Sequence, residues 1–269
     1  MIPMDTVVIV AISLAAGIIG AIVGIGGGFL IVPMLIFGFG LSAQVSAGTS
    51  LIALVFTALS GTIGYTWQGR IDYKLGLSLA VASGPGAVLG SIASTYLTSK
   101  IVIVLFGCFL LLISIYIAFG TPPTTSGTSV AGWRRRLVDR DGKKFEFAVR
   151  HLVLAYPLVF LSGFIAGFFG VGGGALQVPV MIMALGIPPE IATATSALMI
   201  VVSALTGAIA HIQLSNVAYE FTPFIIISVI AGAQIGVQVQ RLASGLALRR
   251  LFALSVVIVG LRMILVLLI

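Results

Sequence analysis

The chain alternates long apolar stretches with short polar connections along nearly its whole length. Most of these stretches are close to the roughly 20 residues with which an α-helix crosses the hydrocarbon core of a bilayer. The pattern therefore predicts an all-α polytopic membrane protein, with the lipid bilayer as its main partner. The apolar stretches cover residues 5–39, 47–66, 74–97, 101–119, 151–186, 192–212, 221–240 and 248–269.

Glycine-rich interruptions occur at matching places in the two halves of the chain. Residues 24–33 and 170–179 carry the same motif, Gly-x-Gly-Gly-Gly-x-Leu-x-Val-Pro. A shift of 146 residues superposes residues 17–90 on residues 163–236 without a gap, and it pairs further glycines as well as the apolar positions. The chain therefore divides into a first repeat (1–120), a linker (121–150) and a second repeat (151–269).

Each repeat is predicted to begin with a helical hairpin that is broken at the glycines and then to cross the membrane three times. In the first repeat, the hairpin covers 5–39 and the crossing helices 47–66, 74–97 and 101–119. In the second, the hairpin covers 151–186 and the helices 192–212, 221–240 and 248–269. Because three is an odd number, the two repeats insert in opposite orientations, as inverted repeats of secondary transporters do.

Charge decides the predicted orientation. The linker carries seven Lys or Arg residues, which the positive-inside rule places in the cytoplasm, and its composition indicates a short interfacial helix near residues 130–137. If both helical hairpins are re-entrant, most remaining cations also lie inside and only Lys100 lies outside. The charge bias favours re-entrant hairpins over crossing ones, although the crossing alternative stays open.

The composition excludes several classes of function. The chain is 59% hydrophobic and 8% charged, far from the roughly 25% charged residues of a soluble domain. All of its Lys and Arg residues except Arg262 lie between or at the edges of the apolar stretches, so the net charge of +7 reflects topology and not a nucleic-acid partner. The sequence has no phosphate-binding loop, no His/Cys metal spacing and no embedded carboxylate, and Cys108 is its lone cysteine. We therefore expect no enzyme activity, no cofactor and no metal, while the oligomeric state is not readable from the sequence.

The two glycine runs are the candidate binding site. Their amides can point together at a ligand, because glycine permits left-handed backbone, and each run precedes a half-helix whose N-terminus carries partial positive charge. Two such ends near the membrane midplane would form an anion site. Close helix packing through small residues is the alternative. The glycines concerned are Gly26, Gly27, Gly28, Gly172, Gly173 and Gly174.

Polar side chains near the glycine runs extend this candidate site. Thr49-Ser50 and Thr195-Ser196 follow the motifs and act either as hydroxyl donors to an anion or as helix N-caps. Gln177, Gln234 and Gln238 lie in the second repeat, where they contact substrate or join helices. Because Ile31 and Val88 occupy the positions that match Gln177 and Gln234, we expect an asymmetric site.

Two further residues have open roles. Arg262 lies inside the last apolar stretch, where its side chain snorkels to the outer interface or lines an anion pathway. His211, which matches Tyr65 in the first repeat, lies near a helix end and either anchors the membrane interface or couples transport to protons.

The duplicated motif, with Thr-Ser following each proline after sixteen residues, resembles the TauE/SafE family of sulfite exporters. The resemblance implies a bacterial or archaeal inner-membrane carrier that exports sulfite, sulfoacetate or related organosulfur anions. It also places the glycine runs, Pro33, Pro179 and both Thr-Ser pairs in the pore. An anion channel built on the same helix dipoles, or a carrier of a different small anion, is the alternative function.

Overall fold

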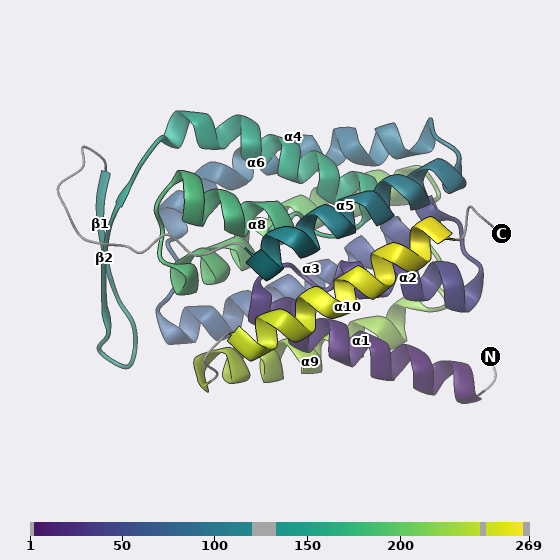
Figure 1. The fold of residues 1–269 in the computed structure, drawn as a ribbon, viewed down its shortest axis with the longest axis horizontal. Helices are drawn as coiled ribbons and strands as arrows, with labels where there is room; N and C mark the ends of the chain where they lie inside the picture. The colour runs from purple at the N-terminus through teal and green to yellow at the C-terminus, as the bar shows by residue number, and fades with distance from the viewer. Residues whose placement is uncertain (1–2, 120–132, 243–245, 266–269) are drawn as a thin grey trace.

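The computed structural model of the chain describes residues 3–119, 133–242 and 246–265, and it is a bundle of helices with a two-stranded β-hairpin at one end (Figure 1). Six of the described helices, namely α1, α3, α4, α6, α8 and α9, are long and apolar enough to cross a membrane. The predicted architecture of a helical polytopic membrane protein is therefore confirmed. In chain order the elements are α1 (Pro3–Val23), α2 (Gly28–Phe39), α3 (Ala43–Gln68), α4 (Tyr73–Thr95), α5 (Ser99–Phe119), β1 (Trp133–Val138), β2 (Lys144–Val149), α6 (Leu152–Phe169), α7 (Gly174–Pro179), the π-helical turn η1 (Val180–Ala184), α8 (Pro189–Gln213), α9 (Thr222–Leu242) and α10 (Leu246–Leu265).

Each repeat begins with a helix that breaks at its glycines and turns back. In the first repeat the break is Gly24–Gly27, between α1 and α2, and in the second it is Gly170–Gly173, between α6 and α7. The amide of Arg150, just before α6, donates to the carbonyl of Leu185, just after η1 (3.1 Å), so the second helical hairpin closes where it opens. That these hairpins are re-entrant in a bilayer stays a prediction.

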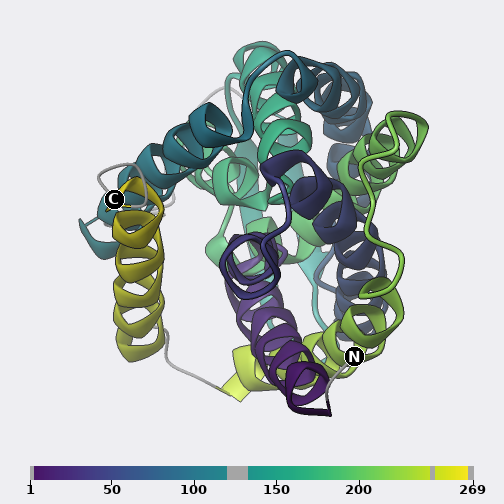
Figure 2. The ribbon, with the colours of Figure 1, turned by 90° about the vertical axis from the view of Figure 1, so that its right-hand side faces the viewer.

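Each helical hairpin packs against the other repeat. Helix α1 packs along α9 and α6 packs along α4, while α3 contacts α8 and α5 contacts α10 (Figure 2). The shift of 146 residues that relates the two halves of the sequence exchanges α1 with α6 and α9 with α4. The two largest helix interfaces are therefore equivalent, and the two repeats are interlocked.

Glycines allow these interfaces to form. A Cβ atom at Gly90 of α4 would lie 1.9 Å from the carbonyl oxygen of Phe164 in α6. A Cβ at Gly236 of α9, the matching position, would lie 2.4 Å from the carbonyl oxygen of Ile18 in α1. Such small residues let helix backbones approach closely in membrane proteins. The glycines that recur at matching positions of the two halves outside the breaks therefore serve helix packing.

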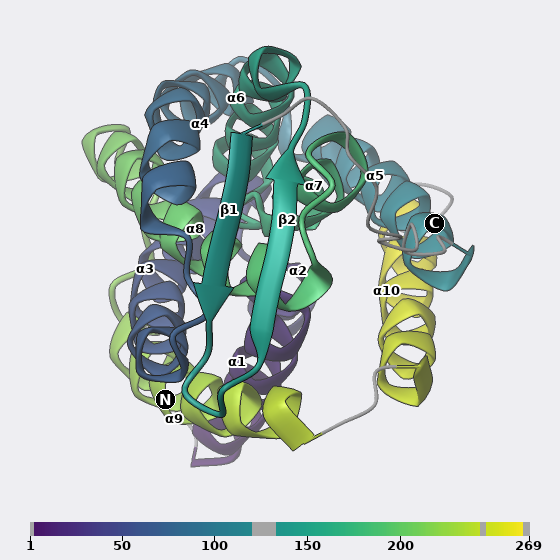
Figure 3. The ribbon, with the colours of Figure 1, turned by 90° about the vertical axis from the view of Figure 1, so that its left-hand side faces the viewer.

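The linker contains a β-hairpin, so the predicted interfacial helix over residues 130–137 is wrong over its described part. Strands β1 and β2 pair antiparallel, with Val138 opposite Lys144 and Trp133 opposite Val149 (Figure 3). Along β2, exposed and buried residues alternate, which is the period of a strand and not of a helix. Gly142 supplies a left-handed residue (φ 81°) in the connecting turn. Residues 130–132 lie outside the described residues.

We predict that Gly90→Ala destabilises the protein by about 1–3 kcal/mol, because the new methyl group must push apart the backbones of α4 and α6. Gly61→Ala in α3 is the matched control, since a Cβ there has no atom within 4 Å. Thermal melting of the purified protein in detergent measures both variants. Equal melting temperatures for the two variants would contradict the close packing of α4 and α6.

Candidate functional site

The two breaks lie against each other inside the bundle. A Cβ atom at Gly28 would lie 2.4 Å from the carbonyl oxygen of Gly170, and one at Gly174 would lie 2.1 Å from that of Gly24. These two contacts are equivalent under the 146-residue shift. Close packing alone explains why positions 28 and 174 are glycine. It also brings together the two backbone segments that sequence analysis proposed as one site.

Each break is held by a serine from the other repeat. Ser50 of α3 donates its hydroxyl to the carbonyl of Gly170 (2.8 Å). The hydroxyl of Ser196 in α8 is shared between the carbonyl of Gly24 (3.1 Å) and that of Thr193 in its own helix (2.8 Å). Both serines are fully buried. A carbonyl at a helix end has no intrahelical donor, so these hydroxyls satisfy groups that the breaks leave free. In this conformation the serine hydroxyl hydrogens therefore serve the backbone.

The neighbouring threonines form a second reciprocal pair of contacts. Thr49 accepts a hydrogen bond from the amide of Ala218 (2.9 Å), and Thr195 accepts one from the amide of Asp72 (3.1 Å). Neither threonine is an N-cap, because α3 and α8 begin six residues earlier; Ser42 caps α3. The capping interpretation of the Thr-Ser pairs is therefore wrong, and the pairs join the repeats.

Within the breaks, the glycines adopt left-handed backbone. Gly26 and Gly27 have φ of 97° and 87°, and Gly172 and Gly173 have φ of 86° and 77°. The amides of Gly27, Gly28, Gly173 and Gly174 donate no hydrogen bond to another described residue. Four buried donors at the starts of two half-helices are a suitable arrangement for an anion.

Leu54 and Ile200 lie over the two breaks, and sequence analysis missed both. A Cβ atom at Gly26 would lie 3.1 Å from the side chain of Leu54, and one at Gly172 would lie 3.0 Å from it; Leu54 is the nearest neighbour in both cases. The side chain of Ile200 also lies within 4 Å of both Cβ positions. The two residues are related by the 146-residue shift. Each lies one helical turn after its serine, at positions 50 and 196, so the i, i+4 spacing of a helix face could have identified them. They close the space between the breaks with apolar atoms.

Gln177 makes the two breaks chemically different. It is fully buried, and neither its side-chain oxygen nor its nitrogen has a partner among the described residues. Its Nε2 lies beside Gly173, at 3.0 Å from where a Cβ atom of that residue would be. At the matching position of the first repeat, Ile31 is buried in an apolar cluster. The predicted asymmetry of the site is therefore present in side-chain chemistry, because a buried amide requires a polar partner.

The other two glutamines do not join Gln177. Gln234 of α9 donates to the backbone carbonyl and the hydroxyl of Ser60 in α3 (2.8 and 2.9 Å), so it joins two helices. Gln238 is exposed. The structure therefore places one of the three predicted glutamines at a break.

Tyr65 of α3 and His211 of α8 occupy equivalent positions, from which they contact carbonyls near the ends of the broken helices α1 and α6. The hydroxyl of Tyr65 donates to the carbonyl of Ala21 (2.7 Å), and Nε2 of His211 lies 3.0 Å from the carbonyl oxygen of Gly167. Both side chains are fully buried, so anchoring of His211 at the membrane interface is wrong. They complete the set of donors that satisfy the broken helices.

Arg262 lies away from the breaks. Its guanidinium stacks over the ring of Phe37 in α2, at 5.0 Å from the ring centroid, and the side chain is exposed. Such a cation–π contact joins α10 to the first helical hairpin. This contact tests neither the snorkelling nor the anion-pathway interpretation of Arg262, and both stay predictions.

The site offers hydrogen-bond donors without ionisable groups. Among the described residues, no cluster of His, Cys, Asp or Glu is suited to hold a metal ion. Broken helices that meet inside a bundle of apolar helices are typical of membrane transporters. The fold and the site thus define a helical membrane protein of the transporter class.

Comparison with known proteins agrees with this class. The family model described as "Sulfite exporter TauE/SafE" matches residues 9–263. The chain therefore belongs to the TauE/SafE family of membrane transporters.

Relatives extend from bacteria to plants. The chain is 32% identical to "Probable membrane transporter protein YunE" of Bacillus subtilis, over 97% of this chain and 98% of that protein. It is 25% identical to "Probable membrane transporter protein MJ0441" of Methanocaldococcus jannaschii, over 96% and 94%. "Sulfite exporter TauE/SafE family protein 5" of Arabidopsis thaliana is 34% identical over 31% of this chain and 19% of that protein. No solved structure matches the chain.

We predict that Ser50→Ala destabilises the protein by about 1–3 kcal/mol, because the buried carbonyl of Gly170 loses its donor. Ser228→Ala is the matched control, since the hydroxyl of Ser228 bonds within its own helix, to the carbonyl of Phe224. Thermal melting in detergent compares the two. A Ser50 variant as stable as the Ser228 variant would mean that the contact between the repeats contributes nothing.

Proposed function

We propose that this protein is a secondary transporter that exports small organosulfur anions, such as sulfite, sulfoacetate or related sulfonates. The substrate site is the junction of the two breaks, Gly24–Gly27 and Gly170–Gly173. Membership of the sulfite exporter family supports this class of substrate. The observation that carries the proposal is the set of free, buried amides at both breaks, together with the unpartnered amide of Gln177.

The chemistry of this junction suits a small oxyanion. Backbone amides and the Nε2 group of Gln177 donate hydrogen bonds, and the half-helix dipoles favour negative charge. Ser50 and Ser196 contact the breaks, and Thr49 and Thr195 precede them in the chain; all four would be drawn into the site when the repeats separate. A site without a buried lysine or arginine binds an anion and also releases it, as a transporter requires.

The two repeats would work by alternating access as inverted repeats. In Figure 1, α1 runs towards the β-hairpin, whereas α6 runs away from it, and the same reversal relates α5 to α10. Opposite directions of matching helices support opposite orientations in the membrane. Rocking of one repeat against the other would then open the junction first to one side and then to the other.

Charge supports the direction and the location of transport. The basic β-hairpin marks the end of the bundle that would face the cytoplasm of a cell with this protein in its inner membrane. An anion that leaves such a cell gains about 2.3 kcal/mol per charge for each 100 mV of membrane potential. Export would therefore need no coupling ion.

A channel is the second candidate function, because helix dipoles can also line a continuous pore. The packing of Leu54 and Ile200 across the junction favours a carrier, since it leaves both breaks covered. Saturable flux with counterflow is the expected result for the carrier. Large currents that rise linearly with voltage would identify the channel.

We predict that proteoliposomes containing the protein take up radiolabelled sulfite in a saturable manner that increases with an imposed membrane potential. Sulfoacetate should compete, because it presents a similar oxyanion. Protein-free liposomes are the control. If no organosulfur anion moves or competes, the substrate proposal is wrong, and a screen of other small anions follows.

A second prediction concerns Gln177→Ile, which gives the second repeat the residue type of Ile31. We expect sulfite flux to fall by about tenfold, the effect of roughly 1.4 kcal/mol of lost interaction with substrate. The fold should be as stable as before or more stable, because an unpaired buried amide is removed. Gln213→Ile, at an exposed position near the end of α8, is the matched control. Unchanged flux in a well-folded Gln177 variant would remove this side chain from the site.

A further inference from the structure

The β-hairpin covers one end of the helix bundle and contacts both repeats. It lies across the ends of the helices in the end-on view of Figure 3. Phe145, Phe147 and Val149 are buried on its inner face. They share one apolar cluster with Leu75 and Leu79 of α4, Met181 of η1, and Leu185, Ile187 and Ile191 at and before the start of α8. The β-hairpin therefore joins the first repeat to the second.

Two buried ion pairs fasten the β-hairpin to the loop between α3 and α4. Arg135 of β1 holds the carboxylate of Asp72 with two nitrogens, one of them Nε at 2.8 Å. Arg70 of the loop holds the carboxylate of Asp139 through Nε (3.3 Å) and Nη2 (3.0 Å). Each side thus supplies one arginine and one aspartate. Because both carboxylates are almost fully buried under the closed β-hairpin, removal of one arginine would leave a carboxylate there without its partner, which destabilises the closed arrangement.

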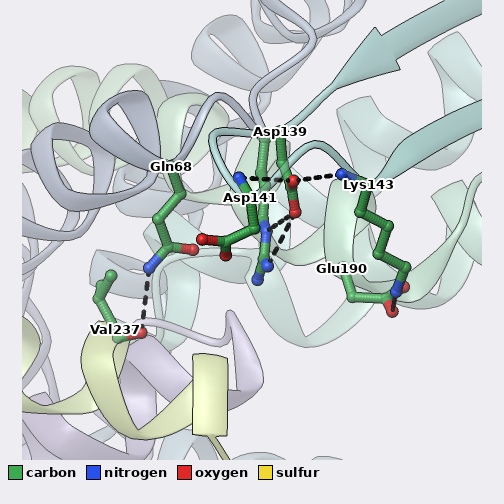
Figure 4. Close-up of polar contacts among 7 residues, drawn as sticks. Gln68, Asp139, Asp141, Lys143, Glu190 and Val237 are labelled. Carbon is green, nitrogen blue, oxygen red and sulfur yellow. Dashed lines mark hydrogen bonds and ion pairs between the residues drawn. The ribbon is translucent and has the colours of Figure 1, made fainter.

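Further contacts surround Asp139 (Figure 4). Its carboxylate accepts the amides of Asp141 (3.0 Å) and Lys143 (2.9 Å). Burial raises the pKa of Asp139, but the Lys143 amide and the Arg70 guanidinium outweigh burial and hold the pKa below its ordinary value. The aspartate is therefore ionised at neutral pH. The side chain of Lys143 also pairs with Glu190 at the start of α8 (3.0 Å).

Asp72 links the β-hairpin to a break. Its carboxylate caps α4 by accepting the amide of Leu75 (3.1 Å), and its own amide donates to Thr195 (3.1 Å). The residue after Thr195 is Ser196, whose hydroxyl bonds the carbonyl of Gly24 in the first break. Arg135, Asp72, α8 and the first break are thus connected by consecutive contacts.

The opposite end of the bundle has no such fastening among the described residues. Under the 146-residue shift, Ala218 corresponds to Asp72 and Thr49 to Thr195. The backbone contact is retained, since the amide of Ala218 donates to Thr49 (2.9 Å). Alanine has no carboxylate, however, so the ion pair of Asp72 with Arg135 has no counterpart at position 218. The two ends of the bundle therefore differ, because among the described residues these two ion pairs occur at the end that the β-hairpin covers.

We propose that the β-hairpin, residues 133–149, is the gate over the cytoplasmic entrance to the junction of the breaks, and that Arg135–Asp72 is the latch that keeps it closed. Asp72 positions the β-hairpin, because its carboxylate binds Arg135 of β1 while it caps α4. When the site opens to this side, the β-hairpin leaves both the loop between α3 and α4 and the start of α8, so both buried ion pairs and the Lys143–Glu190 pair separate. The gate rests on the proposed transport function, but its opening can be measured without any substrate.

Thiol accessibility tests the latch. Leu75 of α4 is fully buried in the apolar cluster that contains Phe145 and Phe147, so Leu75→Cys in a Cys108→Ser background places a thiol beneath the β-hairpin. A hydrophilic maleimide is added to vesicles on the β-hairpin side. We expect Arg135→Gln to increase the labelling rate by about tenfold, which corresponds to about 1.4 kcal/mol of lost closure. Arg134→Gln is the matched control, because Arg134 is an exposed neighbour on the same strand.

The outcomes of this experiment are distinct. Faster labelling in the Arg135 variant alone supports the latch. Equal labelling rates in both variants overturn it, because a general loss of positive charge would then explain the result. Since no substrate is used, failure of sulfite transport leaves this test unaffected.

Cross-linking tests whether the β-hairpin must move, and it does not depend on whether the Arg135 variant folds. Lys143→Cys and Glu190→Cys, again with Cys108→Ser, replace the ion pair between the β-hairpin and α8. A thiol-cleavable bis-maleimide joins the two introduced cysteines. We expect anion flux to fall to the level of empty liposomes and to return when the linker is cleaved.

The matched control ties the β-hairpin to itself. Arg136 and Glu146 face each other across β1 and β2, so a linker between Arg136→Cys and Glu146→Cys leaves the gate free to move as a unit. Flux should persist in this variant. If flux also persists when residues 143 and 190 are cross-linked, the β-hairpin is a static cover and the gate proposal is wrong.

Discussion

Backbone groups that a broken helix leaves without partners must find them elsewhere when water is out of reach, and this constraint organises the whole protein. Each break finds its partners in the opposite repeat. Ser50 serves the carbonyl of Gly170, and Ser196 serves that of Gly24. The repeats are therefore held together at the same place where their helices are interrupted. Separation of the repeats and exposure of the breaks become a single event.

The near-symmetry of the halves makes their differences informative. Gln177 stands where the first repeat has Ile31, and Asp72 stands where the second repeat has Ala218. One difference places an amide at the second break, and the other places an ion pair at one end of the bundle. A transporter with identical halves would treat both sides of the membrane alike. These differences give the protein one break with a polar side chain and one end with buried ion pairs.

Sequence patterns predicted the helical membrane architecture and the two glycine breaks because both depend on consecutive residues. The β-hairpin was missed because the charged run around Arg134–Arg136 was interpreted as an interfacial helix. The alternation of Lys144–Val149 and the turn residue Gly142 carry the signal of a β-hairpin. The ion pairs were beyond such analysis, since Asp72 and Arg135 are 63 residues apart and meet only through the packing of α4 against the linker.

The sequence by itself determined the class of fold, the duplication and the two glycine breaks, because hydrophobic length and backbone freedom are properties of consecutive residues. The tertiary structure alone decided how the breaks are used. It showed that the Thr-Ser pairs join the repeats and do not cap helices, that Leu54 and Ile200 cover the junction, and that Gln234 and Gln238 lie apart from Gln177. Hydrogen bonding between distant segments is set by the packing of whole helices, which no local pattern contains.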